Sequence, residues 1–438
     1  MRPIHFVFLT TLCSGLALAA GALVPAVVHK ASVNVHAKPD FGSPNVATLS
    51  QNQQVQIAGQ EGLWFKLNMP GGAAGYVRIN DVRMAYSGKD DGSALQVLTK
   101  GKAGKGRVSE TAGVRGIDES DLRSASFDSA QLAKLDSYRV TPGTAEANAR
   151  TQGWARTPVA YATEAQPAGP TTGKASSSAK GKSSGGSGWG GLGRGLLGGV
   201  LGAVGKVIPK SEAELSDEEV ALGPEIAGRV LGAAPLWKDD PAQRRINLIG
   251  RWIASQTSRP ELPWTFGVID TPEVNAFAAP GGYVLLTRGL YQLLGSDAEL
   301  AGVLGHEISH IVQRDHYTVI RKQAMSGLGR EIASSQVNIG GGIAGGFAKS
   351  YAEKHGAAIM STSLDREAEY RADEAGQIYL ARAGFNPLAL YAVLQKMTAF
   401  GSQSSRLSQL YKTHPPTTDR LDRIDQRGYG ALETYTRR

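Results

Sequence analysis

Three of the eight histidines lie within residues 305–316, which read GHEISHIVQRDH. Two of them, His306 and His310, are four residues apart, so on a helix they project side by side from one face. At this separation two imidazoles can bind one zinc ion. Glu307, beside the first histidine, then lies where it can deprotonate a water bound to the metal. The pattern favours a zinc site with its own general base over a pair of unrelated histidines.

The sequence around these residues predicts the helix that such a site needs. Ser296 and Glu299 have the spacing of a capping box, which marks a helix start. Apolar residues then recur at helical spacing, at Leu300, Val303, Leu304, Ile308, Ile311 and Val312. We therefore expect His306 and His310 on one face of a single helix.

A third ligand is needed, because catalytic zinc is held by three protein ligands and keeps one position open. Further along, SLDREAEYRADEAGQIYLARAGFNP predicts a second helix, on which Glu369 and Asp373 share a face with Ala372 and Gly376. The small residues would let this helix pack closely against the first. Glu369 can then supply the third ligand, and Asp373 can accept the outward N–H of a ligating histidine. Glu367 is the rival ligand, but its offset of two residues turns it away from that face.

Four motifs of this region occur in the order of a known family. They are NAFAAPGG at residues 275–282, HEISH at residues 306–310, EYRAD at residues 369–373 and HPPTTDRL at residues 414–421. Over roughly residues 211–428 the chain resembles the zinc metallopeptidase family that includes the CAAX prenyl proteases, Oma1 and the bacterial HtpX and BepA proteases. The resemblance implies endopeptidase activity, with His306, His310 and Glu369 as zinc ligands, Glu307 as general base and the NAFAAP segment beside the cleft. The chain lacks the spanning helices of the membrane-embedded members, so it looks more like the exported bacterial branch.

The fold expected for residues 211–430 is α+β, a mainly helical zincin-type metallopeptidase domain with a small β-sheet. Two segments with helical spacing, SDEEVALGPEIAGRVLG and DPAQRRINLIGRWIASQT, precede three short strands in WTFGVID, VNAFAAP and GYVLLT. An extended substrate can add a strand to an exposed sheet edge. The candidate edge of the substrate cleft is the strand that contains Asn275, Ala276, Phe277 and Ala278.

Other histidines near the site are treated separately. His414 precedes two prolines and has three candidate roles: it stabilises the oxyanion, occupies the open zinc position as a latch, or only ends a loop. His316 lies on another side of the helix from His310 and is left out of the site, and His355 receives no role. Between the two site helices, the glycine-rich NIGGGIAGGF suggests a mobile flap over the cleft.

Residues 23–86 predict a small β-barrel. Short runs alternate between apolar and polar residues, as at Val33 and Val35, and the pair Gly71 and Gly72 predicts a hairpin. The order VNVHAKPD, VATL, GLWFKL and GYV resembles the bacterial SH3-like domain. That resemblance implies a binding module for cell-wall peptides or protein partners. A barrel that only spaces or stabilises its neighbour is the alternative.

Residues 1–22 have the pattern of a secretory signal peptide, with Arg2 at the start, an apolar run over residues 6–18 and small residues near Ala20 or Ala22. No later run approaches the roughly 18 apolar residues of a spanning helix, so we expect no transmembrane segment in the mature chain. The single cysteine, Cys13, lies in the signal, which predicts a mature protein without disulfides. The expected location is outside the cytoplasm, in the periplasm.

Residues 87–210 are rich in Gly, Ser, Ala, Lys and Thr, and they predict a disordered linker because too little apolar surface is present to offset the entropy of ordering. One short helix is expected within SFDSAQLAKLDSYRV, residues 126–140. The basic part of the linker could touch an anionic surface, although a solvated tether is the simpler interpretation.

Together these features predict an exported endopeptidase, with one Zn²⁺ per chain, that hydrolyses misfolded or envelope proteins. Two alternatives remain: an envelope assembly or binding factor that does not cleave, and a cell-wall peptide hydrolase. The expected partners are protein or peptide substrates, with cell-wall peptide or an envelope protein at the barrel. The formal charge of +8 among 438 residues is ordinary for solubility, and no nucleic acid partner is expected.

Overall fold

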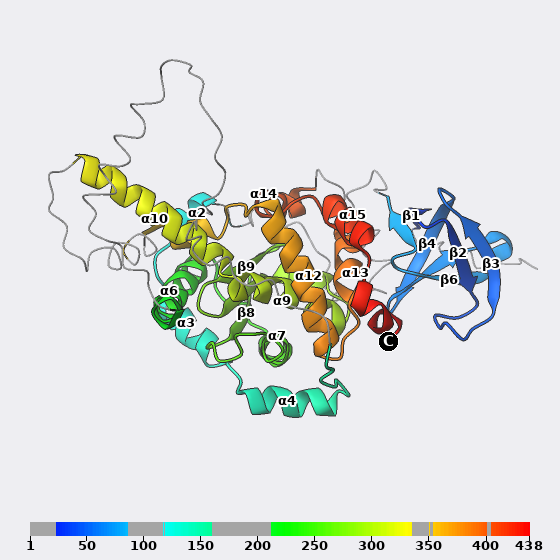
Figure 1. Ribbon diagram of the computed structural model, residues 1–438, viewed down its shortest axis with the longest axis horizontal. Coiled ribbons are helices and arrows are strands. Elements are labelled where there is room, and N and C mark those ends of the chain that lie inside the picture. Colours follow the sequence, from blue (N-terminus) through cyan, green and yellow to red (C-terminus); the bar gives the residue numbers. More distant parts are fainter. Residues whose placement is uncertain are drawn as a thin grey trace, which may run out of the picture.

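The computed structural model describes residues 23–85, 117, 119–159, 212–334, 350, 354–400 and 404–438. The predicted signal peptide, the predicted flap at residues 338–347 and much of the predicted linker lie outside the described residues. Two bodies are seen side by side in Figure 1, a β-barrel near the N-terminus and a larger helical domain around a small sheet. The α+β fold class and the SH3-like barrel are confirmed.

The barrel is one seven-stranded sheet with the order β3-β2-β6-β5-β4-β1-β7, and all the neighbouring strands are antiparallel. Its strands are β1 (Val24–Val28), β2 (Ser32–His36), β3 (Asn45–Ser50), β4 (Gln54–Glu61), β5 (Trp64–Asn68), β6 (Ala74–Arg78) and β7 (Val82–Met84). Val33 and Val35 point into its core, as the alternation predicted. Gly71 and Gly72 have positive φ and turn the chain between β5 and β6.

Residues 119–151, within the span predicted as a linker, form three helices that pack on the larger domain. These are α2 (Glu119–Ser124), α3 (Ser129–Asp136) and α4 (Pro142–Thr151). Asp128 and Thr141 cap the last two through their side chains. Leu135 is fully buried, and its methyl group fills the space beside Gly267, where a side chain would clash. The sequence predicted only one helix here, because the apolar residues that anchor the segment are few and widely spaced.

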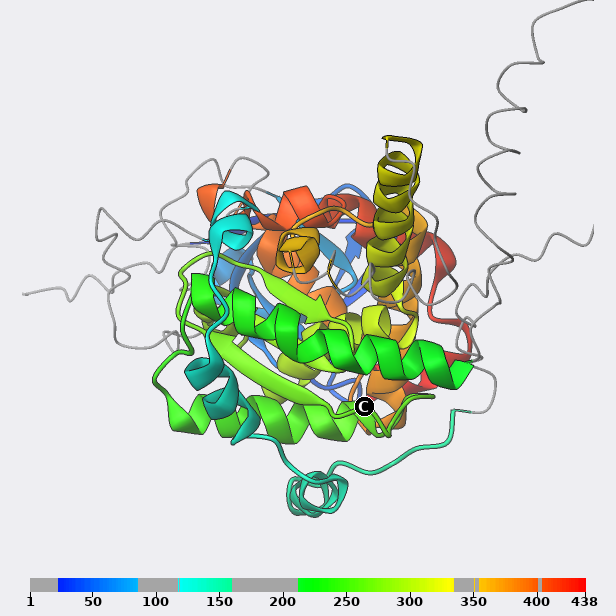
Figure 2. The ribbon, with the colours of Figure 1, turned by 90° about the vertical axis from the view of Figure 1, so that its left-hand side faces the viewer.

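A three-stranded sheet with the order β8-β10-β9 lies at the centre of the larger domain. Its strands are β8 (Thr265–Ile269), β9 (Ala276–Ala279) and β10 (Tyr283–Thr287), and they are buried on both faces. One face packs on α7 (Asp240–Ala254) and α9 (Asp297–Val312), and the other on α3 and α6 (Glu212–Ala233). Figure 2 shows α6 running across the strands. All three predicted strands are therefore present, within one or two residues of their expected limits.

Helices α9 and α12 (Arg366–Arg382) cross at very close range. A Cβ atom on Gly376 would lie 3.1 Å from the backbone nitrogen of His306, and one on Gly305 would lie 3.2 Å from the carbonyl oxygen of Gly376. Glycine on both helices thus allows backbone to approach backbone.

The remaining elements are α8 (Arg288–Leu293), α10 (Asp315–Ser334), α13 (Leu388–Thr398), α14 (Leu410–Thr413), α15 (Thr417–Arg427) and the 3₁₀ turns η1 (Pro70–Gly72), η2 (Ser405–Leu407) and η3 (Gly430–Arg437).

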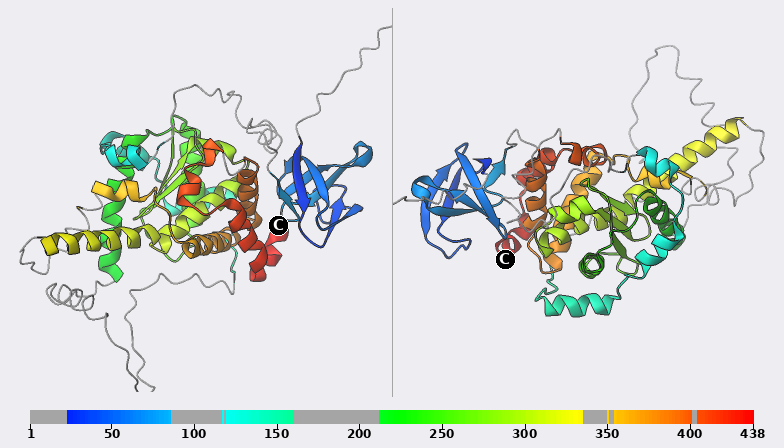
Figure 3. Two further views of the ribbon diagram at one scale, coloured as in Figure 1. Left: turned by 90° about the horizontal axis from the view of Figure 1, so that it is seen from above. Right: turned by 180° about the vertical axis from the view of Figure 1, so that it is seen from behind.

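The barrel lies against α13, α15 and the C-terminal turn η3, as the two views of Figure 3 show. Within the described part of the chain, no helix combines the length and apolar character that crossing a bilayer requires.

Candidate metal centre

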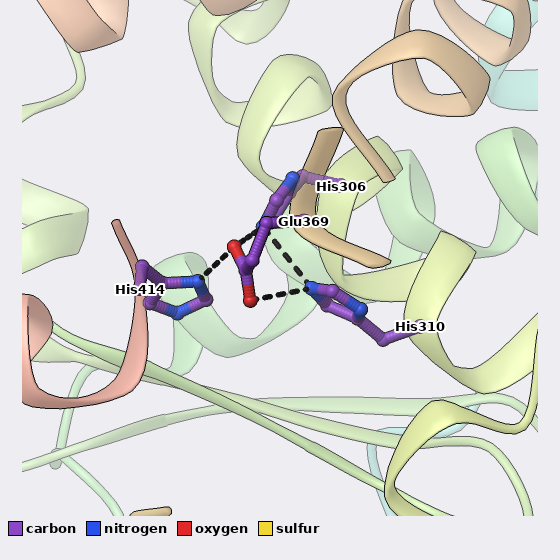
Figure 4. Close-up of side chains that lie close together, drawn as sticks. All are labelled: His306, His310, Glu369 and His414. Carbon is purple, nitrogen blue, oxygen red and sulfur yellow. Dashed lines mark hydrogen bonds and ion pairs between the residues drawn. The ribbon is translucent and has the colours of Figure 1, made fainter. Parts of the chain in front are cut away.

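Four side chains meet at the crossing of α9 and α12. They are His306, His310, Glu369 and His414, all buried, and each offers a ligand atom within 4.8 Å of the others. Figure 4 shows the Glu369 carboxylate between the rings of His310 and His414. The structure thus brings together the three residues expected as ligands and adds His414 to them.

The two imidazoles come from consecutive turns of α9. Their Nε2 atoms are 3.2 Å apart, and the rings are nearly perpendicular. The helix begins at Ser296, whose hydroxyl accepts a hydrogen bond from the Glu299 backbone. The carboxylate of Glu299 does not complete the predicted capping box, because it accepts from the backbone N–H of Gly295 instead.

Glu369 reaches the pair from the first turn of α12. Its Oε2 is 3.6 Å from His306 Nε2, and its Oε1 is 3.7 Å from His310 Nε2. Its rival Glu367 is exposed and lies near Arg423 at the surface. Glu369 Oε1 is buried and accepts no hydrogen bond from the described residues. A buried acceptor without a donor, 3.7 Å from His310 Nε2, fits a small cation with nitrogen and oxygen ligands, and this donor set suits zinc.

The outer nitrogens of both histidines are held by carboxylates. His306 Nδ1 lies 2.9 Å from Asp373, and His310 Nδ1 lies 2.8 Å from Asp315. Each Nδ1 therefore donates its hydrogen outward and leaves Nε2 free for a metal. The sequence predicted that Asp373 lies beside a ligating histidine but missed Asp315. Asp315 follows the break between α9 and α10, where Arg314 adopts positive φ, so helical spacing from His310 gives no signal for it.

Arg420, on α15, is the second residue that sequence reasoning missed. It is buried, forms two hydrogen bonds with the Asp373 carboxylate and lies 3.2 Å from His306 Nδ1. Asp373 is the nearer partner of that nitrogen, so Arg420 balances the charge of Asp373 rather than binding the ring. Its place in the HPPTTDRL segment was the available signal.

These contacts set the charge of the site. Burial raises the pKa of Asp373, but Arg420 and His306 outweigh burial and hold the pKa at about 2. Burial likewise raises the pKa of Glu369, and His414 and His306 hold it well below its usual range. For His306, burial and Arg420 lower the pKa, yet hydrogen bonds to Asp373 and Glu369 raise it to about 9. Before a metal binds, Glu369 and Asp373 are thus ionised and His306 is protonated at neutral pH.

A small cavity adjoins the cluster. Its lining consists of Ala276, Ala278, Glu307, His316, Met360, Thr362, Leu364, Glu369, Thr413 and His414. Its volume of about 10 Å³ is close to the smallest space that admits one water. A peptide therefore cannot enter until some of these residues move. Glu307 is buried on the cavity wall beside the cluster.

Only part of the expected cleft segment lines this cavity. Ala276 and Ala278 face it, whereas Phe277 packs in the apolar cluster on the opposite face of the sheet, because side chains alternate along a strand. Asn275 is buried and does not line the cavity. His316, which was left out of the site, does line it, and burial lowers the pKa of this histidine to about 3, so it is neutral. His355 is not a member of the cluster.

Two regions of the chain match known protein families. Residues 241–428 match the family model described as Peptidase family M48, and residues 31–81 match the model described as Bacterial SH3 domain. Both matches lie inside the domains that the sequence predicted.

Several curated proteins are similar over the helical domain. The beta-barrel assembly-enhancing protease of Escherichia coli (strain K12) is 32% identical over 213 residues, which cover 47% of this chain and 42% of that protein. A protease HtpX homolog of Kineococcus radiotolerans is 28% identical over 250 residues, or 48% of this chain and 80% of that protein. The mitochondrial metalloendopeptidase OMA1 of Arabidopsis thaliana is 29% identical over 154 residues, or 35% and 29%. The chain spans less than half the length of its Escherichia coli relative.

Asp373→Asn is expected to weaken zinc binding about 10- to 100-fold, because the amide no longer holds the tautomer of His306 and leaves Arg420 without its carboxylate. Competition with a chromogenic chelator measures the affinity. Glu374→Gln, at an exposed position of the same helix, is the matched control and should bind zinc as the native protein does. Equal affinities in the two variants would contradict the role given to Asp373.

Zinc binding is expected to release about one proton per ion near pH 7.5, because His306 is protonated before binding and neutral as a ligand. The raised pKa of His306 also affects the stability of the metal-free protein. The protonated imidazole stabilises that fold fully below about pH 6.5, and this stabilisation is lost as the pH rises through about 9. Release should therefore fall to about half a proton per ion at pH 9. Calorimetry in buffers of different ionisation enthalpy measures it, and equal proton release at both pH values would contradict the assignment.

Proposed function

We propose that this chain, which carries a peptidase family M48 domain at residues 241–428 and a bacterial SH3 domain at residues 31–81, is a zinc-dependent endopeptidase. The observation that carries the proposal is the convergence of His306, His310 and Glu369 on one point, with Glu307 beside them on the cavity wall. The two proteases and the metalloendopeptidase similar to this chain support the same activity.

Each residue of the site has a role in peptide hydrolysis. A bound zinc ion would supply Lewis acidity toward the scissile carbonyl and the attacking water. His306, His310 and Glu369 would hold the ion, with Asp373 and Asp315 fixing the two rings. Glu307 would accept the proton of the attacking water and later donate it to the leaving amine.

The substrate would bind as an added strand along β9. Within the described residues this strand pairs only with β10, so its other edge has no strand partner. All four residues of β9 are buried, so the edge is not exposed as the sequence predicted, and a substrate would bind there only after the covering residues move. Ala276 and Ala278 present small side chains toward the cavity, so an opened cavity would have room beside the cluster for the side chains of a peptide. Backbone hydrogen bonds along β9 would then hold the scissile bond near Glu307.

His414 fits the latch role best of its three candidate roles. Its Nδ1 lies 2.6 Å from Glu369 Oε2, and it is close enough to the other ligand atoms to serve as a fourth ligand. A fourth protein ligand would fill the position that a substrate and water need. His414 would therefore withdraw when the cavity opens, together with Thr413 beside it.

The proposed substrates are misfolded or envelope proteins outside the cytoplasm. The signal-like residues 1–22 support export, and the Escherichia coli relative is named for enhancing the assembly of β-barrels. A cell-wall peptide hydrolase and a factor that does not cleave are the competing functions. Release of muropeptides from purified sacculi would indicate the first, and full complementation by a catalytically dead variant the second.

Glu307→Gln is expected to lower the turnover of unfolded casein by about 10² to 10⁴-fold while one zinc per chain is retained, because it removes the proton acceptor and leaves the ligands intact. Turnover is measured with fluorescent casein and zinc by atomic absorption. Glu367→Gln, an exposed carboxylate on α12, is the matched control and should behave as the native protein does. Casein turnover by the Glu307→Gln variant at the native rate would exclude this mechanism.

His414→Ala separates the three roles of this residue. A latch predicts several-fold faster casein cleavage, because the fourth position is freed. A role in stabilising the oxyanion predicts instead a loss of about 10² to 10³-fold in kcat. A residue that only ends its loop predicts unchanged kcat with a lower melting temperature, and either of the last two results would overturn the latch.

A further inference from the structure

The SH3-like barrel contacts the helical domain through buried polar side chains. Gln395, on α13, is completely buried. Its amide accepts from the backbone N–H of Met84 at 3.0 Å and donates to the carbonyls of Ile79 and Val82 at 3.1 and 2.5 Å. One side chain of the helical domain thus satisfies three backbone groups at one end of the barrel.

Ion pairs surround this buried contact. Arg83 pairs with Asp425 and, at 3.0 Å, with Asp422, both on α15, and His29 lies 3.1 Å from Asp425. Arg78 of β6 is buried and donates to the carbonyl of Thr436 in the C-terminal turn η3. The barrel and the helical domain also share one continuous apolar core. The barrel therefore has a fixed position relative to α13 and α15 (Figure 3).

One barrel residue reaches the metal-binding helix itself. Gln60, at the end of β4, donates to Glu299 Oε1 at 3.0 Å, and both side chains are buried. Glu299 lies in the first turn of α9, about two turns before His306 and on the same side of the helix. Its other oxygen accepts from Lys396 Nζ of α13 and from the Gly295 N–H, each at 2.7 Å.

The Glu299 carboxylate is thus a buried junction of three segments. Lys396 is 2% exposed and Glu299 is 2% exposed, so water screens neither charge. A buried carboxylate needs donors on both oxygens, and Gln60 is the donor that the structure gives to Oε1. Removing Gln60 would leave that oxygen unsatisfied at the start of the helix that carries His306 and His310.

We propose that the docked barrel positions the metal-binding helix, with Gln60 as a positioning residue that acts through Glu299 and Lys396. The inference rests on the proposed function insofar as the positioned helix carries the zinc ligands and Glu307. The barrel is then a part of the catalytic unit, and its detachment would loosen α9. Gln60 belongs neither to the cluster of metal-binding side chains nor to the cavity beside it.

Gln60→Met in the full-length, zinc-loaded protein tests the proposal, because methionine keeps the length of the side chain but cannot donate. Gln56→Met, at an exposed position of the same strand, is the matched control. We expect hydrogen exchange in the first turns of α9 and zinc loss to a chelator to be about tenfold faster in the Gln60 variant only, a size typical of one lost hydrogen bond to a charged group. Casein cleavage should show a lower kcat with KM unchanged.

Equal exchange in α9 and equal zinc loss in the two variants would overturn the proposal, as would faster exchange confined to the barrel. If Gln60→Met does not fold, Gln60→Asn gives the same comparison, because its amide is one methylene too short to reach Glu299. A native protein that neither binds zinc nor cleaves casein would refute the proposed function alone. The exchange of α9 would still decide the coupling between barrel and helix.

Discussion

The contact of Gly305 with Gly376 is the constraint on which the rest of the site depends. Only at this backbone distance can a side chain as short as Glu369 extend from α12 to the two imidazoles of α9. A Cβ atom at Gly376 or Gly305 would lie 3.1 or 3.2 Å from the backbone of the other helix, so the helices would have to move apart by a few tenths of an ångström. The sheet and α13 also pack on α9, on sides other than the one that faces α12. The packing of the whole domain therefore holds the two helices this close together.

Charge balance is the second requirement of such a buried site. Glu369 and Asp373 are both within 2% of complete burial, and neither would remain ionised in an apolar environment without partners. Arg420 compensates Asp373, and the three histidines or a metal compensate Glu369. The same principle recurs at the other end of α9, where Lys396 and Gln60 satisfy Glu299. The metal-binding helix is therefore held at both ends by buried polar groups from distant parts of the chain.

Local sequence patterns predicted the elements well, because helical spacing and strand alternation are short-range properties. The pairs His306 with His310 and Glu369 with Asp373 fall into this class. The contacts that were missed are long-range or cross a helix break. Arg420 and Asp315 have no periodic relation to the histidines, and Gln60 resembles any polar residue of a barrel strand until its partner is known. The packing of residues 119–151 was missed for a similar reason, since a few well-placed apolar residues suffice to anchor helices on a preformed domain.

Two residues of α9 and one of α12 are proposed to hold a single metal ion. X-ray absorption at the zinc edge of the native protein, compared with Glu369→Gln, is the decisive measurement for this site. We expect one zinc per chain with imidazole nitrogens at about 2.0 Å and a carboxylate oxygen at a similar distance that is lost in the variant. An identical coordination sphere in the two proteins would contradict it.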